Sequence, residues 1–300
     1  MHYNPIKLKD KALFERFSRV GTRELSAHSF ANIFIWKGLF NIFWSIINNS
    51  LCIFFQDKIG TFLYLPPLGE RCSTGTIRQC FSIMDALNSN KDVSRIENIP
   101  EKEAGFYRSL GYECACKGNE YVYRRENLAA LKGDSFKPKR ALFNYFIKHY
   151  SYDYRPYVPS YKEDCLALYE IWMSGRRKKS TDIIYSLMLE DSRSVLKVAL
   201  PNYNKLGLRG RVVIISRRVR GYTFGFELNK ETFCILFEIA DLTVKGLPQF
   251  IFRKFSEELN GYSYINAMDD SGLENLRRVK LSYRPSRLVP SYIARRKNGA

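Results

Sequence analysis

The sequence predicts an α/β protein built as two halves, each with a partly antiparallel mixed sheet. The 300 residues are 45% hydrophobic and 15% aromatic, which is enough for one large domain or two ordinary ones and excludes wholesale disorder. Apolar residues recur at helical spacing in some segments and alternate or run continuously in others. Both halves also share one order of elements, although no residue-level repeat accompanies it: helices, three antiparallel strands, helix, strand, helix, strand.

The first half is predicted to begin with two helices followed by a run of strands. The predicted helices cover residues 8–17, 29–36, 76–88 and 101–110, and the predicted strands cover 43–48, 51–56, 61–65 and 112–123. The uncharged stretch from Gly38 to Phe55 is as long as a short membrane span. Because Asn48-Asn49-Ser50 in its middle is a turn signal, we expect a helix end and a buried hairpin there, and no transmembrane segment.

Pro156 and Pro159 mark a connection between the halves. We therefore expect an N-terminal domain of residues 1–155 and a C-terminal domain of residues 156–300. From residue 137 onward the predicted helices cover 137–150, 161–173, 181–190, 247–259 and 272–280. Strands are predicted within 211–238 and at 262–266 and 288–293.

The chain is strongly basic. It has 48 Lys and Arg against 30 Asp and Glu, a formal net charge of +18, which favours polyanionic partners. Two runs contain no acid: residues 205–220 with six basic side chains, and residues 277–300 with eight. Such runs suit phosphodiester backbones or lipid phosphates. The alternative is a solvated basic face.

Histidine and cysteine usage argues against several kinds of site. With three histidines, a His-centred mechanism or a His-rich metal site is not expected. The seven cysteines are odd in number and irregularly spaced, which predicts reduced thiols and no disulfide framework. Cys114 and Cys116 are the one close pair, and no second pair completes a zinc site. The N-terminus lacks the pattern of a signal peptide, so we expect a cytoplasmic protein. Peripheral contact with the inner face of the cell membrane is compatible with this expectation.

Five motifs together resemble one protein family. They are Ser29–Trp36 (SFANIFIW), Phe62–Gly69 (FLYLPPLG), Gly221–Phe226 (GYTFGF), Phe237–Asp241 (FEIAD) and Tyr264–Pro285 (YINAMDDSGLENLRRVKLSYRP). Their order and spacing are similar to those of the C-terminal domain family of phosphatidylglycerol lysyltransferase. The resemblance implies two tandem GNAT-like domains, of the acyl-CoA N-acyltransferase type. It also implies transfer of an aminoacyl group from a charged tRNA to the phosphatidylglycerol headgroup, whereas structurally related Fem-type enzymes use a peptidoglycan precursor amine.

Acyl transfer needs a proton acceptor, donors for the oxyanion and a firmly held donor ester. The C-terminal half offers polar groups where strands end and helices begin, positions that a mixed sheet exposes to a crevice. The candidate catalytic residues are Glu238, Asp241, Asp269, Asp270 and Tyr283, and the candidate substrate- or phosphate-binding residues are Lys245, Arg277 and Lys280. These residues also have structural alternatives. Glu238 and Asp241 could pair with arginine at a strand end, Asp269 and Asp270 could cap a helix, Tyr283 could be a packed aromatic, and the basic residues could form a solvated face.

Three functions are therefore weighed. The first is an aminoacyl or acyl transferase without a resident cofactor, whose donor is aminoacyl-tRNA or acyl-CoA. The second is a catalytically silent protein that binds tRNA or anionic lipid on the same scaffold. The third is a CoA-dependent N-acetyltransferase, for which Val244-Lys245-Gly246-Leu247 is a weak signal because it offers one glycine between a strand and a helix.

Overall fold

The computed structural model describes residues 3–18, 24–70, 72–180 and 182–297. These residues form two compact units that do not follow chain order. Unit 1 contains the described residues up to Glu120, together with Asp269–Gly272 and those from Leu288 onward. Unit 2 contains Tyr121–Met268 and Leu273–Arg287. The connection expected near residue 155 falls inside unit 2 in this grouping, and the expected domain boundary stays a prediction.

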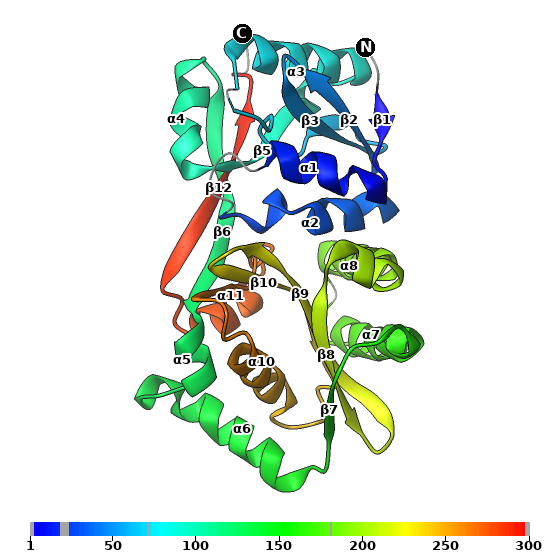
Figure 1. Cartoon of the computed structure of the whole chain (residues 1–300), viewed down its shortest axis with the longest axis vertical. Coiled ribbons are helices and arrows are strands. Elements are labelled where there is room, and N and C mark those ends of the chain that lie inside the picture. Colours follow the sequence, from blue (N-terminus) through cyan, green and yellow to red (C-terminus); the bar gives the residue numbers. More distant parts are fainter. Residues whose placement is uncertain (1–2, 19–23, 71, 181, 298–300) are drawn as a thin grey trace. The chain divides into compact units, whose positions relative to one another are not determined.

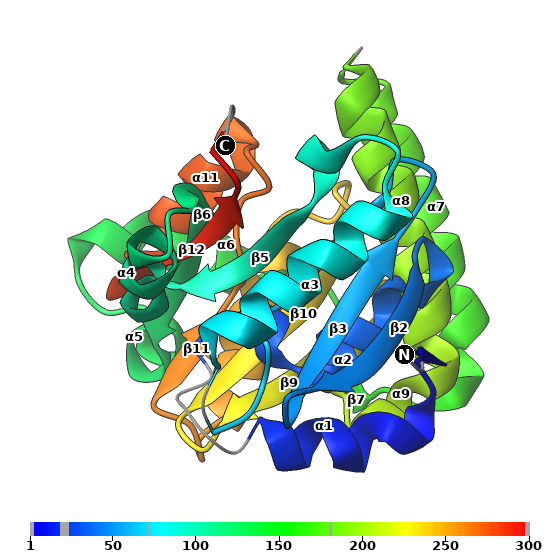
Figure 2. The same cartoon turned by 90° about the horizontal axis from the view of Figure 1, so that it is seen from above.

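Unit 1 is a mixed sheet with helices on both faces. Its neighbouring strands follow the order β1-β2-β3-β4-β5-β12, and β4 and β5 are parallel while the other pairs are antiparallel. The strands are β1 (Asn4–Pro5), β2 (Asn41–Ile47), β3 (Ser50–Gln56), β4 (Thr61–Leu63), β5 (Arg95–Pro100) and β12 (Arg287–Arg295), and β6 (Glu113–Arg124) begins in this unit. The helices are α1 (Lys11–Phe17), α2 (Phe30–Ile35), α3 (Thr74–Leu87) and α4 (Glu101–Ser109). The helix α3 covers one face, and α1 and α2 cover the other (Figures 1 and 2).

The expected hairpin in the long uncharged stretch is confirmed. Strands β2 and β3 pair from Asn41↔Gln56 to Ile47↔Ser50. Asn48 and Asn49 connect them at φ values of 48° and 61°, which suits a two-residue hairpin turn because asparagine tolerates the left-handed region. Throughout the described residues, every helix is too short or too polar to cross a bilayer.

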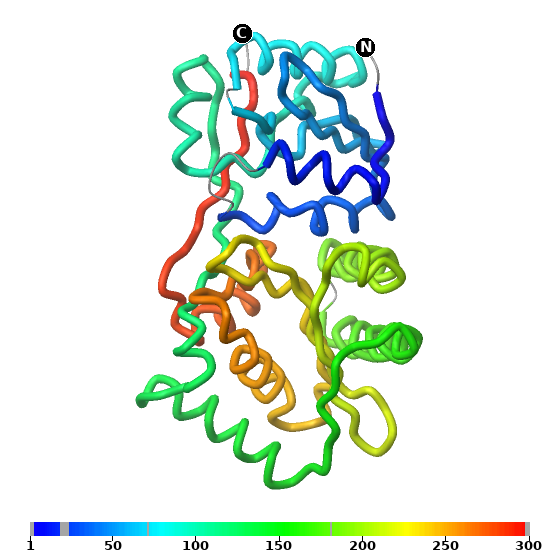
Figure 3. Tube along the Cα trace, viewed as in Figure 1, coloured from blue at the N-terminus to red at the C-terminus, as the bar shows by residue number. Residues whose placement is uncertain are grey.

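Unit 2 contains the strands that neighbour one another in the order β6-β11-β10-β9-β8-β7. Its strands are β7 (Asp153–Pro156), β8 (Arg209–Ile215), β9 (Arg218–Asn229), β10 (Thr232–Ala240) and β11 (Tyr264–Asn266), besides the end of β6. Its helices are α5 (Arg125–Ala130), α6 (Lys137–His149), α7 (Lys162–Arg177), α8 (Ile183–Ala199), α9 (Tyr203–Leu206), α10 (Leu247–Glu258) and α11 (Glu274–Leu281). After β6 the chain passes through α5 and α6 before it returns to these strands at β7 (Figure 3).

The helix α10 lies on one face of the unit 2 sheet, and α7 and α8 lie on the other (Figure 1). Beneath α10 are two apolar clusters. One contains Phe233, Ile235 and Phe252, and the other contains Ala240 and Phe250. Gly221 of β9 permits the close approach of α10, because a Cβ at this position would lie 2.3 Å from the Cδ1 atom of Ile251.

Candidate functional site

A β-bulge in β10 places a carboxylate between these two apolar clusters. Ile235 lies opposite Gly225 of β9, but Phe237 lies opposite Phe224, so Leu236 is an extra residue in the ladder. The extra residue brings Glu238 to the face on which Ile235 packs, and without it the strand alternation would turn Glu238 away. Glu238 thus lies inside β10, two residues before the end of the strand at Ala240 and not at the strand end expected from the sequence, and its role stays a prediction.

Glu238 belongs to a row of side chains that runs across three strands. It lies opposite Thr223 of β9, which lies opposite Arg211 of β8. Side chains that face each other in an antiparallel pair project from the same side of the sheet. Because Arg211 donates from Nε to Glu258 of α10 at 2.7 Å, the row lies on the α10 side.

The Glu238 carboxyl group is held in an apolar setting. Its Oε2 atom is buried and has no hydrogen-bond partner among the described residues, and the same is true of Thr223 Oγ1. Burial raises the pKa of Glu238 from 4.5 to about 8, and the positive charge of Lys280 opposes part of that rise. The carboxyl group is therefore mostly protonated at neutral pH and able to exchange a proton near it.

Two further predicted residues lie close enough to Glu238 to interact with it electrostatically. Burial, followed by the negative charge of Glu238, raises the pKa of the Tyr283 hydroxyl. The Tyr283 ring packs edge-on against Phe252 at 4.7 Å between centroids, and Lys139 Nζ lies 4.4 Å from its centroid. Burial also lowers the pKa of Lys139. The ammonium group of Lys280 donates hydrogen bonds to the carbonyl oxygens of Ala267 and Met268, the latter at 3.2 Å. Glu238, Lys280 and Tyr283 thus form one cluster of unit 2.

Strands β10 and β11 separate beside this cluster. They pair in parallel only over Thr232–Cys234 and Tyr264–Asn266, whereas β10 continues to Ala240. Beyond Cys234 the edge of β10 towards β11 has no strand partner in the described part of the chain. Main-chain N–H groups at such an opened edge are available to a ligand, and they suit an oxyanion.

The remaining predicted residues of unit 2 lie in other settings. Asp241 accepts from Arg220 Nη1 at 2.6 Å and from the Thr243 hydroxyl at 2.7 Å. Burial alone would raise the pKa of Asp241, but the bonds from Thr243 and Arg220 outweigh it and hold that pKa below its ordinary value. Lys245 is exposed, with Nζ 4.4 Å from the centroid of the Tyr145 ring.

Arg277 is exposed on α11, and among the described residues its guanidinium has no ion-pair partner. The neighbouring Arg278 instead pairs with Glu274 at 3.0 Å. Asp269 and Asp270 belong to unit 1, where each closes a tight turn: Asp269 Oδ1 accepts from Ser271 N at 3.1 Å, and Asp270 Oδ1 accepts from Gly272 N at 3.0 Å. Neither caps α11, which begins at Glu274.

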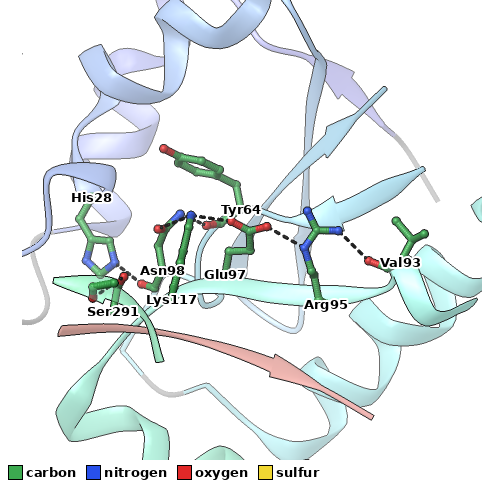
Figure 4. A network of polar contacts seen from close by, with 9 residues as sticks. His28, Tyr64, Val93, Arg95, Glu97, Asn98, Lys117 and Ser291 are labelled. Atoms are coloured by element: carbon green, nitrogen blue, oxygen red, sulfur yellow. Dashed lines mark hydrogen bonds and ion pairs between the residues drawn. The ribbon is translucent and has the colours of Figure 1, made fainter. Parts of the chain in front are cut away.

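Unit 1 holds a polar network that the sequence reasoning missed (Figure 4). Buried Glu97 of β5 accepts from Lys117 Nζ and from Arg95 Nε, both at 2.6 Å. Lys117 also donates to Asn98 Oδ1 at 3.0 Å, and Asn98 Nδ2 donates to the carbonyl of Tyr64 at 2.9 Å. Burial would raise the pKa of Glu97, but the two cations outweigh it and lower that pKa.

The same network includes a residue in the left-handed backbone region and has an electrostatic link to a tyrosine. Asn98 has φ of 51°, in the left-handed region, and its carbonyl oxygen lies 3.0 Å from His28 Nε2. Burial, followed by the charges of Glu97, Glu120 and Asp269, raises the pKa of Tyr64. The signal in the sequence that indicates this network is the polar pair Glu97-Asn98 between Ile96 and Ile99 in one strand.

No group of three or more His, Cys, Asp or Glu side chains suited to a metal ion occurs within the described ranges. Within the described ranges no disulfide bond joins any of the cysteines, and 3.5 Å separates Cys52 Sγ from Cys80 Sγ.

Comparisons with known proteins agree with the geometry of the fold. Residues 19–295 match the family described as phosphatidylglycerol lysyltransferase, C-terminal. A crystal structure of a conserved protein of unknown function from Bacteroides thetaiotaomicron is 26% identical, with a TM-score of 0.86 over 98% of this chain and 99% of that one. The structure of L-PGS from Bacillus licheniformis is 14% identical, with a TM-score of 0.70 over 99% and 94%.

A tandem GNAT protein from the clavulanic acid biosynthesis pathway is 9% identical, with a TM-score of 0.50 over 100% of this chain and 99% of that one. A search of curated proteins finds no match. The predicted mixed α/β fold of the tandem GNAT type is confirmed.

Proposed function

Because the chain belongs to the phosphatidylglycerol lysyltransferase C-terminal family, we propose that it is an aminoacyl transferase whose donor is an aminoacyl-tRNA. The proposed acceptor is a hydroxyl group of an anionic phospholipid headgroup such as that of phosphatidylglycerol. The net charge of +18 supports two partners that both carry phosphate. Exposed Arg277 is the proposed contact to a donor phosphate.

Glu238 carries the proposal. Transfer requires the acceptor hydroxyl to lose its proton as its oxygen attacks the ester carbonyl. The ionised Glu238 carboxylate takes that proton, the new C–O bond forms, and the bond to the tRNA ribose oxygen breaks. Glu238 then returns the proton to the departing ribose oxygen, so atoms and charges balance. A pKa of about 8 suits both steps, because the two protonation states are close in free energy near neutral pH.

The surroundings of Glu238 support a second requirement, donors for the oxyanion. The opened edge of β10 offers N–H donors for the oxyanion. Lys280 donates hydrogen bonds to the carbonyl oxygens of Ala267 and Met268 and so supports the turn that follows β11. Met268 has φ of 60°, so this turn needs such support.

The glycine before α10 argues against a CoA-dependent acetyltransferase. Gly246 has φ of 86°, and a Cβ there would lie 2.2 Å from the carbonyl oxygen of Leu142. Packing against α6 therefore accounts for this glycine without a pyrophosphate. The N-terminal turn of α10 continues with Leu247 and Pro248, and Pro248 brings no N–H.

The test is transfer from a panel of labelled aminoacyl-tRNAs to phosphatidylglycerol vesicles. Glu238→Gln keeps the shape of the side chain and removes the proton acceptor, so we expect kcat to fall by a factor of about 100 or more. Glu163→Gln is the matched control, because its side chain is 78% exposed. Transfer at the wild-type rate by Glu238→Gln would overturn the assigned role. Absence of transfer by the wild type, with retained tRNA binding, would favour the silent binding protein.

A further inference from the structure

Helices α7 and α8 carry several strongly exposed aliphatic side chains. Ile183 is 75% exposed, Ile184 70%, Ile171 64% and Leu187 58%. These are four of the five most exposed large hydrophobic residues in the described part of the chain. The exposed residues of α8 do not pack into the unit 2 core. The residues of α8 that are buried there are Leu189, Val195, Leu196 and Ala199. Isolated exposed hydrophobics need no explanation, but such a concentration does.

Basic residues occupy the same end of the helix pair, where α7 and α8 contact each other (Figure 2). Arg176, Arg177, Lys178 and Lys179 follow one another at the end of α7. We define Arg177, Lys178 and Lys179 together with Ile183, Ile184 and Leu187, which lie in the first turns of α8, as the α7–α8 tip; Arg176 is left out because its guanidinium lies over the Trp172 ring. Lys178 and Lys179 are exposed, and neither has an ion pair within the described residues.

The acids near the tip are already engaged. Asp182 Oδ1 accepts from the N–H groups of Ile184 and Tyr185 at 2.8 and 3.3 Å and so caps α8. Glu190 pairs with Arg177 and with Arg193, the latter at 2.7 Å. The tip therefore presents a net positive charge beside an aliphatic surface.

We propose that the α7–α8 tip docks on an anionic lipid bilayer. A bilayer interface accepts both kinds of side chain at once: isoleucine and leucine enter the boundary between headgroups and acyl chains, and lysine and arginine meet the lipid phosphates. A protein partner is less suited, because protein interfaces favour aromatic residues and arginine and are depleted in lysine. The positive charge of the tip complements anionic headgroups, and its aliphatic side chains suit the acyl chains beneath them, so the tip fits an anionic lipid surface. Docking does not require catalysis, so it stands apart from the proposed transfer reaction.

Docking through the α7–α8 tip would let an enzyme that uses a lipid substrate bind the membrane reversibly. Two kinds of contact at one small tip give reversible binding, which lets the protein leave one lipid and reach another. Increasing salt weakens the cationic part and leaves the aliphatic part. We therefore expect vesicle binding to require both the cationic and the aliphatic side chains of the tip.

The experiment is co-sedimentation of the full chain with vesicles of phosphatidylcholine alone, or of phosphatidylcholine with phosphatidylglycerol. We expect binding only to the second kind, and weaker binding at high salt. Lys178→Glu/Lys179→Glu and Ile183→Ser/Ile184→Ser should each lower the partition coefficient by about tenfold or more. Their thermal unfolding should match the wild type, because all four residues are exposed.

The matched control is Lys58→Glu/Ile59→Ser, an exposed Lys-Ile pair of unit 1 with Ile59 69% exposed. We expect it to bind within twofold of the wild type. Equal binding by the wild type and both tip variants would overturn the proposal, and so would equal binding to the two kinds of vesicle. Loss of a dimer in either tip variant, with vesicle binding unchanged, would assign the tip to a second copy of the chain instead.

Discussion

Replacing Glu238 with glutamine should make the protein more stable at neutral pH while it removes transfer. The folded state raises the pKa of Glu238 from 4.5 to about 8. In the unfolded chain at pH 7 the carboxyl group is ionised, but in the folded chain roughly nine-tenths of the molecules keep it protonated. Each pH unit above the unfolded pKa and below the folded one costs about 1.4 kcal/mol of folding free energy. At pH 7 the cost is about 3 kcal/mol, because pH 7 lies some 2.5 units above the unfolded value.

The sign of the pH dependence follows from the same values. Below pH 4.5 both states are protonated and Glu238 costs nothing. Between pH 4.5 and about 8 the wild type loses stability relative to Glu238→Gln, and above that the difference is constant. The assay is urea unfolding of both proteins from pH 4.5 to 9, with the difference in unfolding free energy plotted against pH. Other titrating groups cancel in that difference. A difference that is flat across this range would refute the raised pKa and, with it, the argument that burial tunes this carboxyl group.

The other predictions concern the basic residues. Arg277→Ala should reduce transfer strongly with a melting temperature close to that of the wild type, because Arg277 is exposed and without an ion pair in the described chain; unfolding by this variant would show a structural role instead. Lys280→Ala should lower the melting temperature, because it releases the carbonyl oxygens of Ala267 and Met268, and a thermal scan checks this. Lys117→Met should cost about 1–3 kcal/mol in urea unfolding, because it leaves buried Glu97 with Arg95 alone. That cost should shrink as the pH falls below 4.5, since the lowered pKa of Glu97 stabilises the fold only while the carboxyl is ionised.

Local rules recovered most of the elements because those elements are locally specified. The Asn48-Asn49 turn fixed the β2–β3 hairpin, and Gly111 with φ of 90° follows the end of α4 as expected of a helix stop. The helix α5 was missed because Arg125–Ala130 spans only six residues, too few to show a period. The predicted start of one helix at residue 181 lies outside the described residues, and the described helix α8 runs on to Ala199.

The candidate site was harder to predict because its members meet through tertiary contacts. Motifs single out Glu238, Lys280 and Tyr283, but nothing local distinguishes them from Asp241, which pairs with Arg220 and accepts a hydrogen bond from Thr243. Charge type at a strand end is visible in a sequence. Whether a cation lies near it depends on which side chains the neighbouring strands bring to the same face.

The bulge at Leu236 explains why a carboxylate occupies an apolar layer at all. Strand alternation places Phe233 and Ile235 beneath α10, and one extra residue then allows Glu238 and Ala240 to continue on that face. Glu238 consequently enters the space between two apolar clusters, where desolvation raises its pKa. The bulge occurs just beyond Cys234, the last residue that pairs with β11. A single insertion therefore coincides with two of the three requirements of acyl transfer, a carboxyl group tuned by burial and an opened strand edge, and this coincidence favours a reactive role for Glu238 over a merely structural one.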